Sequence, residues 1–224
     1  MLLNYCKASA DTGEWHSFLF LRYMKLSILI LLFLLTGNGF LLGQRPELEI
    51  TYMNSVPDAA RYIAYDLHRP LTIADFQGKP DELTDVVAIT SSGFQYRAGY
   101  RRSGSKSILK VSVYCSFDRK ESWMKEKGRD PQVLAHEQAH FDISYLQTLL
   151  FMQRLRQLRL GEQGFMEQLR EEYDAAVKEL RARQRQYDQE TDHGTLPDIQ
   201  LVWSKRIRND ISAVFHREKA LTDD

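Results

Sequence analysis

The pattern of apolar and polar positions divides residues 44–224 into a strand-rich half and a helical half. Up to residue 128, short runs of β-branched and aromatic residues alternate with Gly, Pro and Ser, which is typical of strands joined by turns. The Ser-Gly pairs at 92–93 and 103–104 predict turns, so we expect the last three strands to form an antiparallel meander. The predicted strands span residues 49–52, 62–66, 86–90, 94–100 and 108–117.

Within the run at 108–117, apolar and more polar residues alternate from Leu109 onward. Such alternation indicates a strand with one buried face and one wetter face. Cys115 falls on the apolar face, where we expect a small buried hydrophobe. The only other cysteine is Cys6, so the chain has no disulfide framework.

Beyond residue 128 the apolar spacing becomes helical. Asp130 suits a helix N-cap and Pro131 suits the first helical position, so a long helix is predicted at 131–160. A second, amphipathic helix is predicted at about 163–186 and a third at about 198–216. The fold class is therefore α+β, with an antiparallel sheet followed by a long helix, its hairpin partner and a C-terminal helix.

Composition and charge narrow the function classes. The chain has 224 residues, of which 43% are hydrophobic and 27% charged, which indicates a folded protein and excludes disorder throughout. Its 30 basic and 30 acidic side chains cancel, so there is no overall electrostatic reason to expect nucleic acid as a partner.

Residues 1–43 are predicted to be an N-terminal extension and signal peptide, with Met24 as the true start. Lys25 precedes an apolar run at 26–35, and small polar residues follow at 36–39. The run is short for a membrane span, which needs about 20 residues, although an uncleaved anchor remains the alternative. We therefore expect a secreted or periplasmic protein whose single domain is residues 44–224.

One cluster carries the chemistry, and it is His136-Glu137-Gln138-Ala139-His140. Histidines four residues apart on a helix project from one face, about 40° apart, so both can bind one metal ion. In the metalloprotease arrangement, the glutamate takes a proton from a zinc-bound water and passes it to the leaving amine. Apolar residues on the opposite side would anchor this helix in the core, namely Leu134, Phe141, Tyr145, Leu149 and Met152.

A catalytic zinc site needs a third protein ligand and an open position. If the first two helices form an antiparallel hairpin that turns near residue 162, the chain returns to the level of His140 near residue 184. It returns to the level of His136 near residue 188. The segment at 187–194 is dense in possible ligands and lies at this level.

Within this segment we expect His193 to be the third ligand, with Glu190 and then Asp188 as alternatives. Imidazole and carboxylate both bind zinc, and the sequence does not fix the turn. Asp188 or Asp192 could instead hydrogen-bond to a liganding imidazole and orient it. Tyr187 could donate a hydrogen bond to a developing oxyanion, or could belong to the core.

Five motifs follow one another along the chain, namely Leu71 to Pro80, Ala88 to Gly93, Ser122-Trp123, His136 to Ile143 and Tyr187 to Gly194. They occur in the same order in a known family. The sequence resembles bacterial domain-of-unknown-function family 922, described as predicted secreted zinc-dependent proteases of the HExxH type. The resemblance spans roughly residues 60–215 and implies a zincin-like, metal-dependent hydrolase that uses Zn²⁺, His136, Glu137, His140 and His193.

These observations predict a secreted zinc metallopeptidase whose partner is a peptide or protein substrate. The site face of the helix, with Val133, Ser144 and Gln147, is expected to line a cleft. An extended peptide could add to a sheet edge near residues 108–117. Two alternatives remain, a non-catalytic zinc-binding module of the cell envelope and a metal-dependent hydrolase of a non-peptide amide.

Overall fold

The computed structural model describes residues 47–104, 106–158 and 164–222. They belong to one compact unit, Gln44–Asp224, so the predicted signal peptide lies outside the described residues. Within these ranges no helix has both the length and the apolar character required to cross a membrane.

The main sheet is built around strand β5 (Lys106–Asp118). On one side β5 pairs antiparallel with β4 (Ser92–Ser103) along its length. On the other side it pairs parallel with β1 (Glu47–Tyr52) and antiparallel with β2 (Tyr62–Ala64). The predicted strands all form, and the alternating apolar residues of β5 are fully buried. The sheet is mixed, however, so the prediction of a purely antiparallel sheet is wrong.

Strand β3 (Ala88–Ile89) does not join this sheet, and the predicted three-stranded meander is therefore wrong. It pairs instead with β6 (Trp123–Met124), which follows β5 in sequence. The Ser122 hydroxyl accepts a hydrogen bond from the Ser91 amide at 2.9 Å, which ties β3 to the segment beyond β5. Of the strands in the described ranges, only β4 and β5 form a hairpin, and its turn contains Gly104 at φ +61°.

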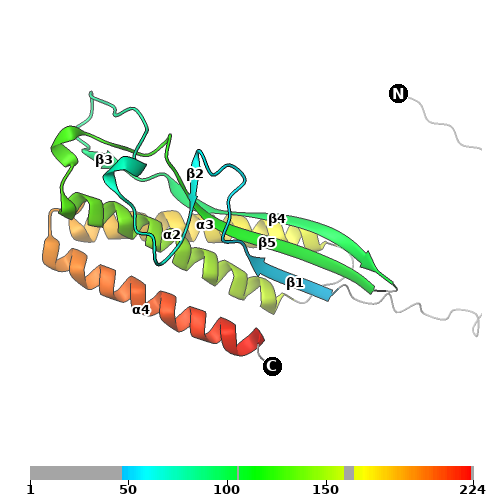
Figure 1. Ribbon diagram of the computed structural model, residues 1–224. Helices are drawn as coiled ribbons and strands as arrows, with labels where there is room; N and C mark the ends of the chain where they lie inside the picture. The colour runs from blue at the N-terminus through cyan, green and yellow to red at the C-terminus, as the bar shows by residue number, and fades with distance from the viewer. Residues whose placement is uncertain (1–46, 105, 159–163, 223–224) are drawn as a thin grey trace, which may run out of the picture. The chain divides into compact units, whose positions relative to one another are not determined.

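Three long helices cover one face of the sheet, and Figure 1 shows their arrangement. They are α2 (Pro131–Gln157), α3 (Phe165–Thr191) and α4 (Pro197–Thr222). Helix α2 lies in the middle and contacts the sheet, α3 and α4. The Asp130 side chain accepts hydrogen bonds from two amides of the first turn of α2, which confirms the predicted N-cap. The α+β fold class is confirmed.

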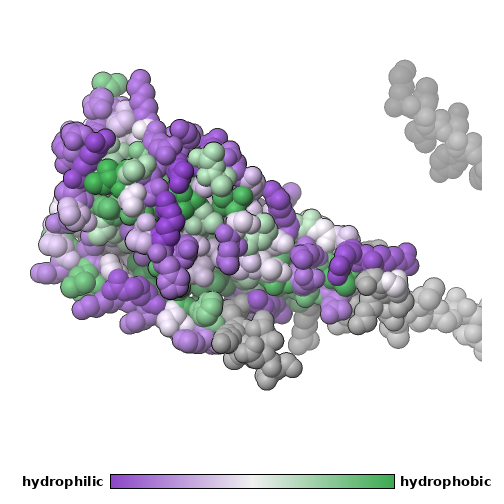
Figure 2. All heavy atoms as spheres, in the orientation of Figure 1, coloured by the Kyte–Doolittle hydropathy of each residue, from purple (hydrophilic) through white to green (hydrophobic). Residues whose placement is uncertain are grey.

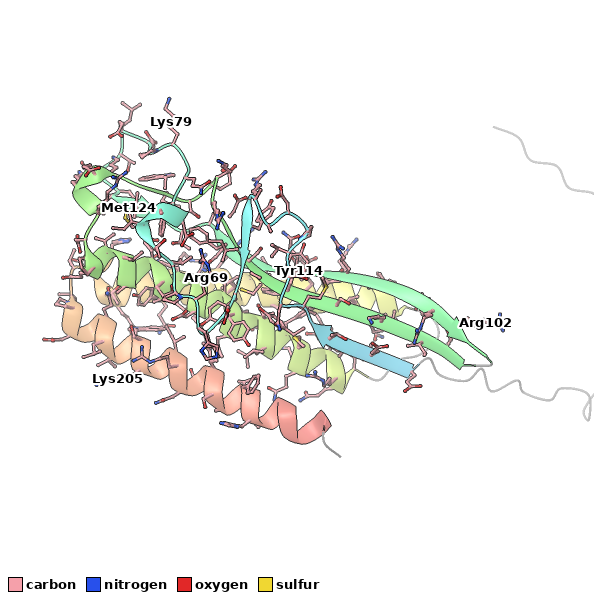
Figure 3. The ribbon with its side chains drawn as sticks, in the orientation of Figure 1. Arg69, Lys79, Arg102, Tyr114, Met124 and Lys205 are labelled. Carbon is pink, nitrogen blue, oxygen red and sulfur yellow. The ribbon has the colours of Figure 1, made fainter. Side chains whose placement is uncertain are left out.

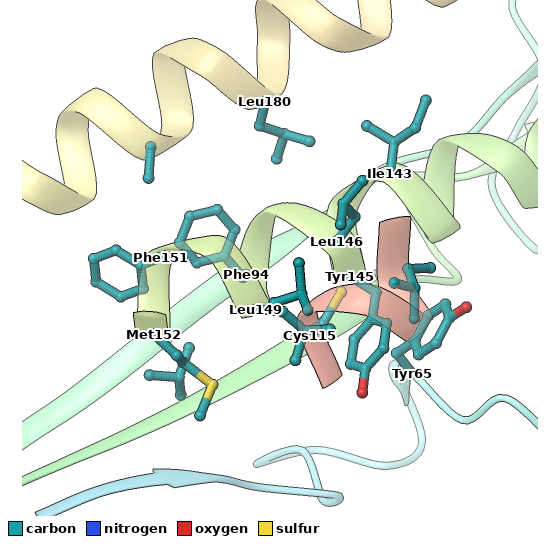
Figure 4. Packing of buried hydrophobic residues seen from close by; sticks show 14 of the residues in the cluster. Tyr65, Phe94, Cys115, Ile143, Tyr145, Leu146, Leu149, Phe151, Met152 and Leu180 are labelled. Atoms are coloured by element: carbon teal, nitrogen blue, oxygen red, sulfur yellow. The ribbon is translucent and has the colours of Figure 1, made fainter. Parts of the chain in front are cut away.

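The core fills the space between the sheet and α2, as Figure 4 shows. Tyr65 stacks on Tyr145 with ring centroids 4.0 Å apart, and Phe94 packs on Phe151 at 5.3 Å. Cys115 is buried, as predicted. Four of the five predicted anchors of α2 are buried and Leu134 is partly buried, so this side of the helix is fixed against the sheet.

Polar residues cover much of the face seen in Figure 2.

Candidate metal centre

Helix α2 brings His136 and His140 together near its N-terminus. Their Nε2 atoms lie 3.3 Å apart, and the rings meet edge to face at 87°. The two side chains are only 7% and 13% exposed. The predicted convergence of the two imidazoles on one face is therefore confirmed.

Helix α3 supplies a carboxylate to the same point. Asp188 Oδ1 lies 2.8 Å from His140 Nε2 and 3.2 Å from His136 Nε2. These three side chains form a group that can hold a metal ion. Ligands at about 2.0–2.1 Å from a tetrahedral zinc ion lie roughly 3.3 Å from one another, so the observed separations suit a single cation. Two imidazole nitrogens and a carboxylate oxygen also suit other first-row divalent metals.

The environment of Asp188 keeps its carboxylate charged. Burial alone would raise its pKa, but hydrogen bonds and charge from His136 and His140 outweigh this effect. The pKa of Asp188 therefore lies below its usual range. A liganding carboxylate must be deprotonated, so Asp188 meets this requirement at neutral pH.

The first choice for the third ligand, His193, is not in this group. Helix α3 extends beyond its predicted end at residue 186 to Thr191, so residue 188 is still helical and faces α2. His193 follows in the turn after the helix, is exposed and has a φ of 53°. Residue 188 does return to the level of the two histidines, as predicted, but the third member of the group comes from the helix and not from the turn.

The other predicted ligands of this segment have different partners. Glu190 accepts hydrogen bonds from Gln186 and from the indole of Trp203, the latter at 2.8 Å. Asp192 accepts from the Thr195 hydroxyl at 2.7 Å. Neither belongs to the group formed by the described residues around His136.

Tyr187 supports the centre from behind. Its ring stacks on His136 at 4.7 Å and meets His140 edge to face at 5.2 Å. Burial, together with the charges of Glu137 and Asp188, raises the pKa of this phenol. The hydroxyl is buried and has no hydrogen-bond partner among the described residues. A substrate oxyanion could reach it only after a rearrangement, so the predicted role as oxyanion donor gains no support from this position.

Gly194 also contacts the centre, although it was not among the predicted site residues. Its φ is +85°, and a Cβ at this position would lie 2.9 Å from Cγ and 3.0 Å from Nδ1 of His136. The Gly194 carbonyl accepts a hydrogen bond from Gln132 Nε2 at 2.7 Å, which ties the turn to the first turn of α2. A glycine after a helix normally indicates a C-cap, so its sequence position gave no sign of the contact.

Glu137 is the remaining acidic group at the centre. It is only 5% exposed, and its backbone carbonyl accepts from the Thr90 hydroxyl at 3.3 Å. Its carboxylate makes no hydrogen bond within the described part of the chain. The carboxylate oxygens are not among the fully buried atoms without a partner, so solvent reaches them although the residue as a whole is buried. A carboxylate in this position can accept a hydrogen bond from water.

Part of the predicted cleft is closed by α3. Ser144 is fully buried and its hydroxyl contacts that of Ser92 at 2.8 Å. Gln147 is 1% exposed and donates to Glu179 of α3 at 3.0 Å. Ser144 and Gln147 therefore join the helices to each other and to β4, and they do not line a cleft.

The chain is thus an α+β protein with a His-His-Asp group that can hold a metal ion between two helices. Residues 115–194 match the sequence model of a family described as "Bacterial protein of unknown function (DUF922)". This match supports the resemblance to that family and contains the last three of the five ordered motifs. It also contains the end of β5, the whole of α2 and α3, and the three residues of the metal group. Searches of curated proteins and of solved structures each found no significant match.

Proposed function

We propose that this protein is a secreted zinc-dependent metallopeptidase in which Glu137 is the general base. The observation that carries the proposal is the carboxylate of Glu137, which has no hydrogen bond among the described residues and is reached by solvent, although the residue is only 5% exposed. It lies next in sequence to the ligand His136 on the same helix. A purely structural metal site would not require this carboxylate.

His136 and His140 would hold the zinc ion through Nε2, and Asp188 would hold it through Oδ1. When bound, zinc lowers the pKa of a coordinated water to about 7 and polarises a carbonyl group. The free carboxylate of Glu137 can accept a proton from water and transfer it to the departing amine. Tyr187 and Gly194 hold the His136 ring in place during this transfer.

The number of ligands favours catalysis over a structural role. Structural zinc sites use four protein ligands, whereas catalytic sites use three and leave a position for water or substrate. Among the described residues, the group contains three possible ligands. This count supports the peptidase over a non-catalytic zinc-binding module.

An extended substrate would bind at a different strand from the one predicted. Both edges of β5 are already paired, so residues 108–117 cannot accept a further strand. In the described residues β4 pairs only with β5, so no strand occupies its outer edge, and α3 contacts this edge through a hydrogen bond from Tyr173 to the Phe94 carbonyl. This edge begins at Ser92, whose hydroxyl donates to the carbonyl of His140 at 3.4 Å. A peptide along β4 would therefore start near the backbone of His140, one of the two histidines of the centre.

The test is the hydrolysis of mixed peptides by the purified zinc-loaded protein, with and without a chelator. We expect cleavage by the wild type, loss of cleavage with chelator and recovery when zinc is added. Glu137→Gln should keep its zinc and lose about 10²–10⁴-fold in rate, because the general base is gone. Glu171→Gln, on an exposed part of α3, is the matched control and should keep full activity. Full activity of Glu137→Gln, or indifference to the chelator, would refute the proposal.

A further inference from the structure

The face of α3 that carries Asp188 also carries a cationic groove. A cavity of about 570 Å³ lies along this helix and contains three basic residues and one acidic residue. Arg181 precedes Asp188 by seven residues, so the two lie roughly 20° apart around the helix axis. We call this cavity the α3 groove; it is lined by Tyr173, Asp174, Val177, Lys178, Arg181 and Arg185.

The basic side chains of the α3 groove are available to bind a ligand. Lys178, Arg181 and Arg185 are exposed, and none of them makes an ion pair with another described residue. Arg154 shows the contrast, because it is paired with Glu179 on another side of the same helix. Since Asp174 is the groove's only acid, the α3 groove has an excess of positive charge.

The α3 groove adjoins the edge of β4 that has no neighbouring strand among the described residues. The Tyr173 hydroxyl donates to the Phe94 carbonyl at 3.0 Å. The Tyr173 ring also packs edge to face on Phe94 and Tyr96, with centroids 5.4 and 5.1 Å apart. Every second residue of a strand at the edge of a sheet directs its N–H and C=O groups away from the neighbouring strand. The hydrogen bond to the Phe94 carbonyl therefore shows that the outer edge of β4 faces α3. One wall of the groove is therefore next to the strand where we place the substrate.

Distances along α3 relate the cations to positions in a substrate. From Asp188, Arg185 is about 4.5 Å, Arg181 about 10 Å and Lys178 about 15 Å along the helix axis. An extended peptide advances about 3.3 Å per residue. The three cations would therefore meet side chains roughly one to five residues from the bond at the metal centre.

We propose that the α3 groove selects peptide substrates that carry acidic side chains on one side of the scissile bond. The inference rests on the proposed peptidase function, because it assigns the substrate class of the same centre. Its physical basis is charge complementarity between unpaired cations and carboxylates. The interaction is exposed, so it should weaken as the salt concentration rises.

The experiment measures binding of two fluorescein-labelled peptides of equal length, one alternating Glu and Ala, the other Lys and Ala. Fluorescence anisotropy is recorded with zinc-loaded Glu137→Gln protein, which binds without cleaving. We expect the Glu peptide to bind more tightly at low salt, and to lose this preference at high salt. Reversing two charges, with Arg181→Glu and Arg185→Glu, should reduce the preference by about tenfold.

The matched control is Lys205→Glu, which reverses an exposed cation on α4; Figure 3 labels Lys205 on that helix. It should change the preference by less than about twofold, because it is not part of the α3 groove. Circular dichroism verifies that all variants are folded. An unchanged preference in the Arg181 and Arg185 variant, or no preference in the parent protein, overturns the inference. Absence of cleavage of any peptide by the wild type refutes the peptidase function separately, because binding requires no turnover.

Discussion

Replacement of Gly194 by Ala tests whether the turn after α3 holds His136 in place. The structure provides a matched control in Gly164, which also has a positive φ, +92°, but where an added methyl group would have no atom of the described residues within 4 Å. At Gly194, φ is +85° and the new methyl group would lie 2.9–3.1 Å from three atoms of His136. The two substitutions share the backbone cost, and only one of them contacts the imidazole.

The expected losses of stability follow from these contacts. An alanine in the left-handed region costs about 1–2 kcal/mol, of which about 0.4–1 kcal/mol is offset because alanine restricts the unfolded chain. Gly164→Ala should therefore lower stability by roughly 1 kcal/mol, or about 2–4 °C in melting temperature. Gly194→Ala adds overpacking of about 1–3 kcal/mol, so its melting temperature should fall by roughly 5–15 °C.

Zinc affinity separates the packing effect from the backbone effect. Displacement of His136 should weaken zinc binding by about 10–100-fold, as is typical when a group that orients a ligand is disturbed. Gly164→Ala should bind zinc as tightly as the wild type. Thermal unfolding of the metal-free proteins and competition with a chromophoric chelator give the two quantities. Equal losses of stability, together with unchanged zinc affinity in Gly194→Ala, would show that the reasoning about the His136 contact is wrong.

Two further predictions concern the third ligand and the response to acid. Asp188→Ala should lower zinc affinity by more than about 100-fold while His193→Ala keeps it, since only Asp188 lies with the two imidazoles. Elemental analysis after gel filtration measures this, and the opposite pattern contradicts the assignment of Asp188. Burial opposes ionisation of Asp75, but hydrogen bonds from Arg69 and Thr72 outweigh it and lower the pKa of Asp75. The contribution of Asp75 to stability is therefore complete above about pH 4 and is lost as the pH falls through its folded pKa. The free energy of unfolding of Asp75→Asn, measured in urea, should therefore decrease less below about pH 4 than that of the wild type.

Local signals in the sequence predicted the elements and the two histidines of the candidate metal group well. Asp130 and Pro131 defined the start of α2, and the four-residue spacing then placed His136 and His140 on one face. These signals act within one turn of a helix, so they do not depend on how the rest of the chain packs. The alternation along β5 likewise identified its buried face.

Features set by long-range packing were not accessible in the same way. No local signal shows that β1 pairs parallel with β5, because the direction of pairing depends on the whole path between the two strands. The choice among Asp188, Glu190 and His193 depended on where α3 ends. Helix ends are uncertain by a few residues from sequence, and one residue corresponds to a rotation of about 100°. An error of a few residues in the predicted end of α3 was therefore enough to favour His193 over Asp188.

The metal centre depends on a helix that lies outside the segment matched by the family. That segment ends at residue 194, before α4 begins at Pro197. Yet Trp203 of α4 packs edge to face on Tyr187 at 5.4 Å, and Tyr187 in turn stacks on His136. Gln200 of the same helix donates to the Gln132 carbonyl in the first turn of α2 at 3.1 Å. Helix α4 therefore braces both α2 and α3 at the level of the ligands. Because a metal site requires its ligands to be held in position by their neighbours, we infer that the functional unit includes α4.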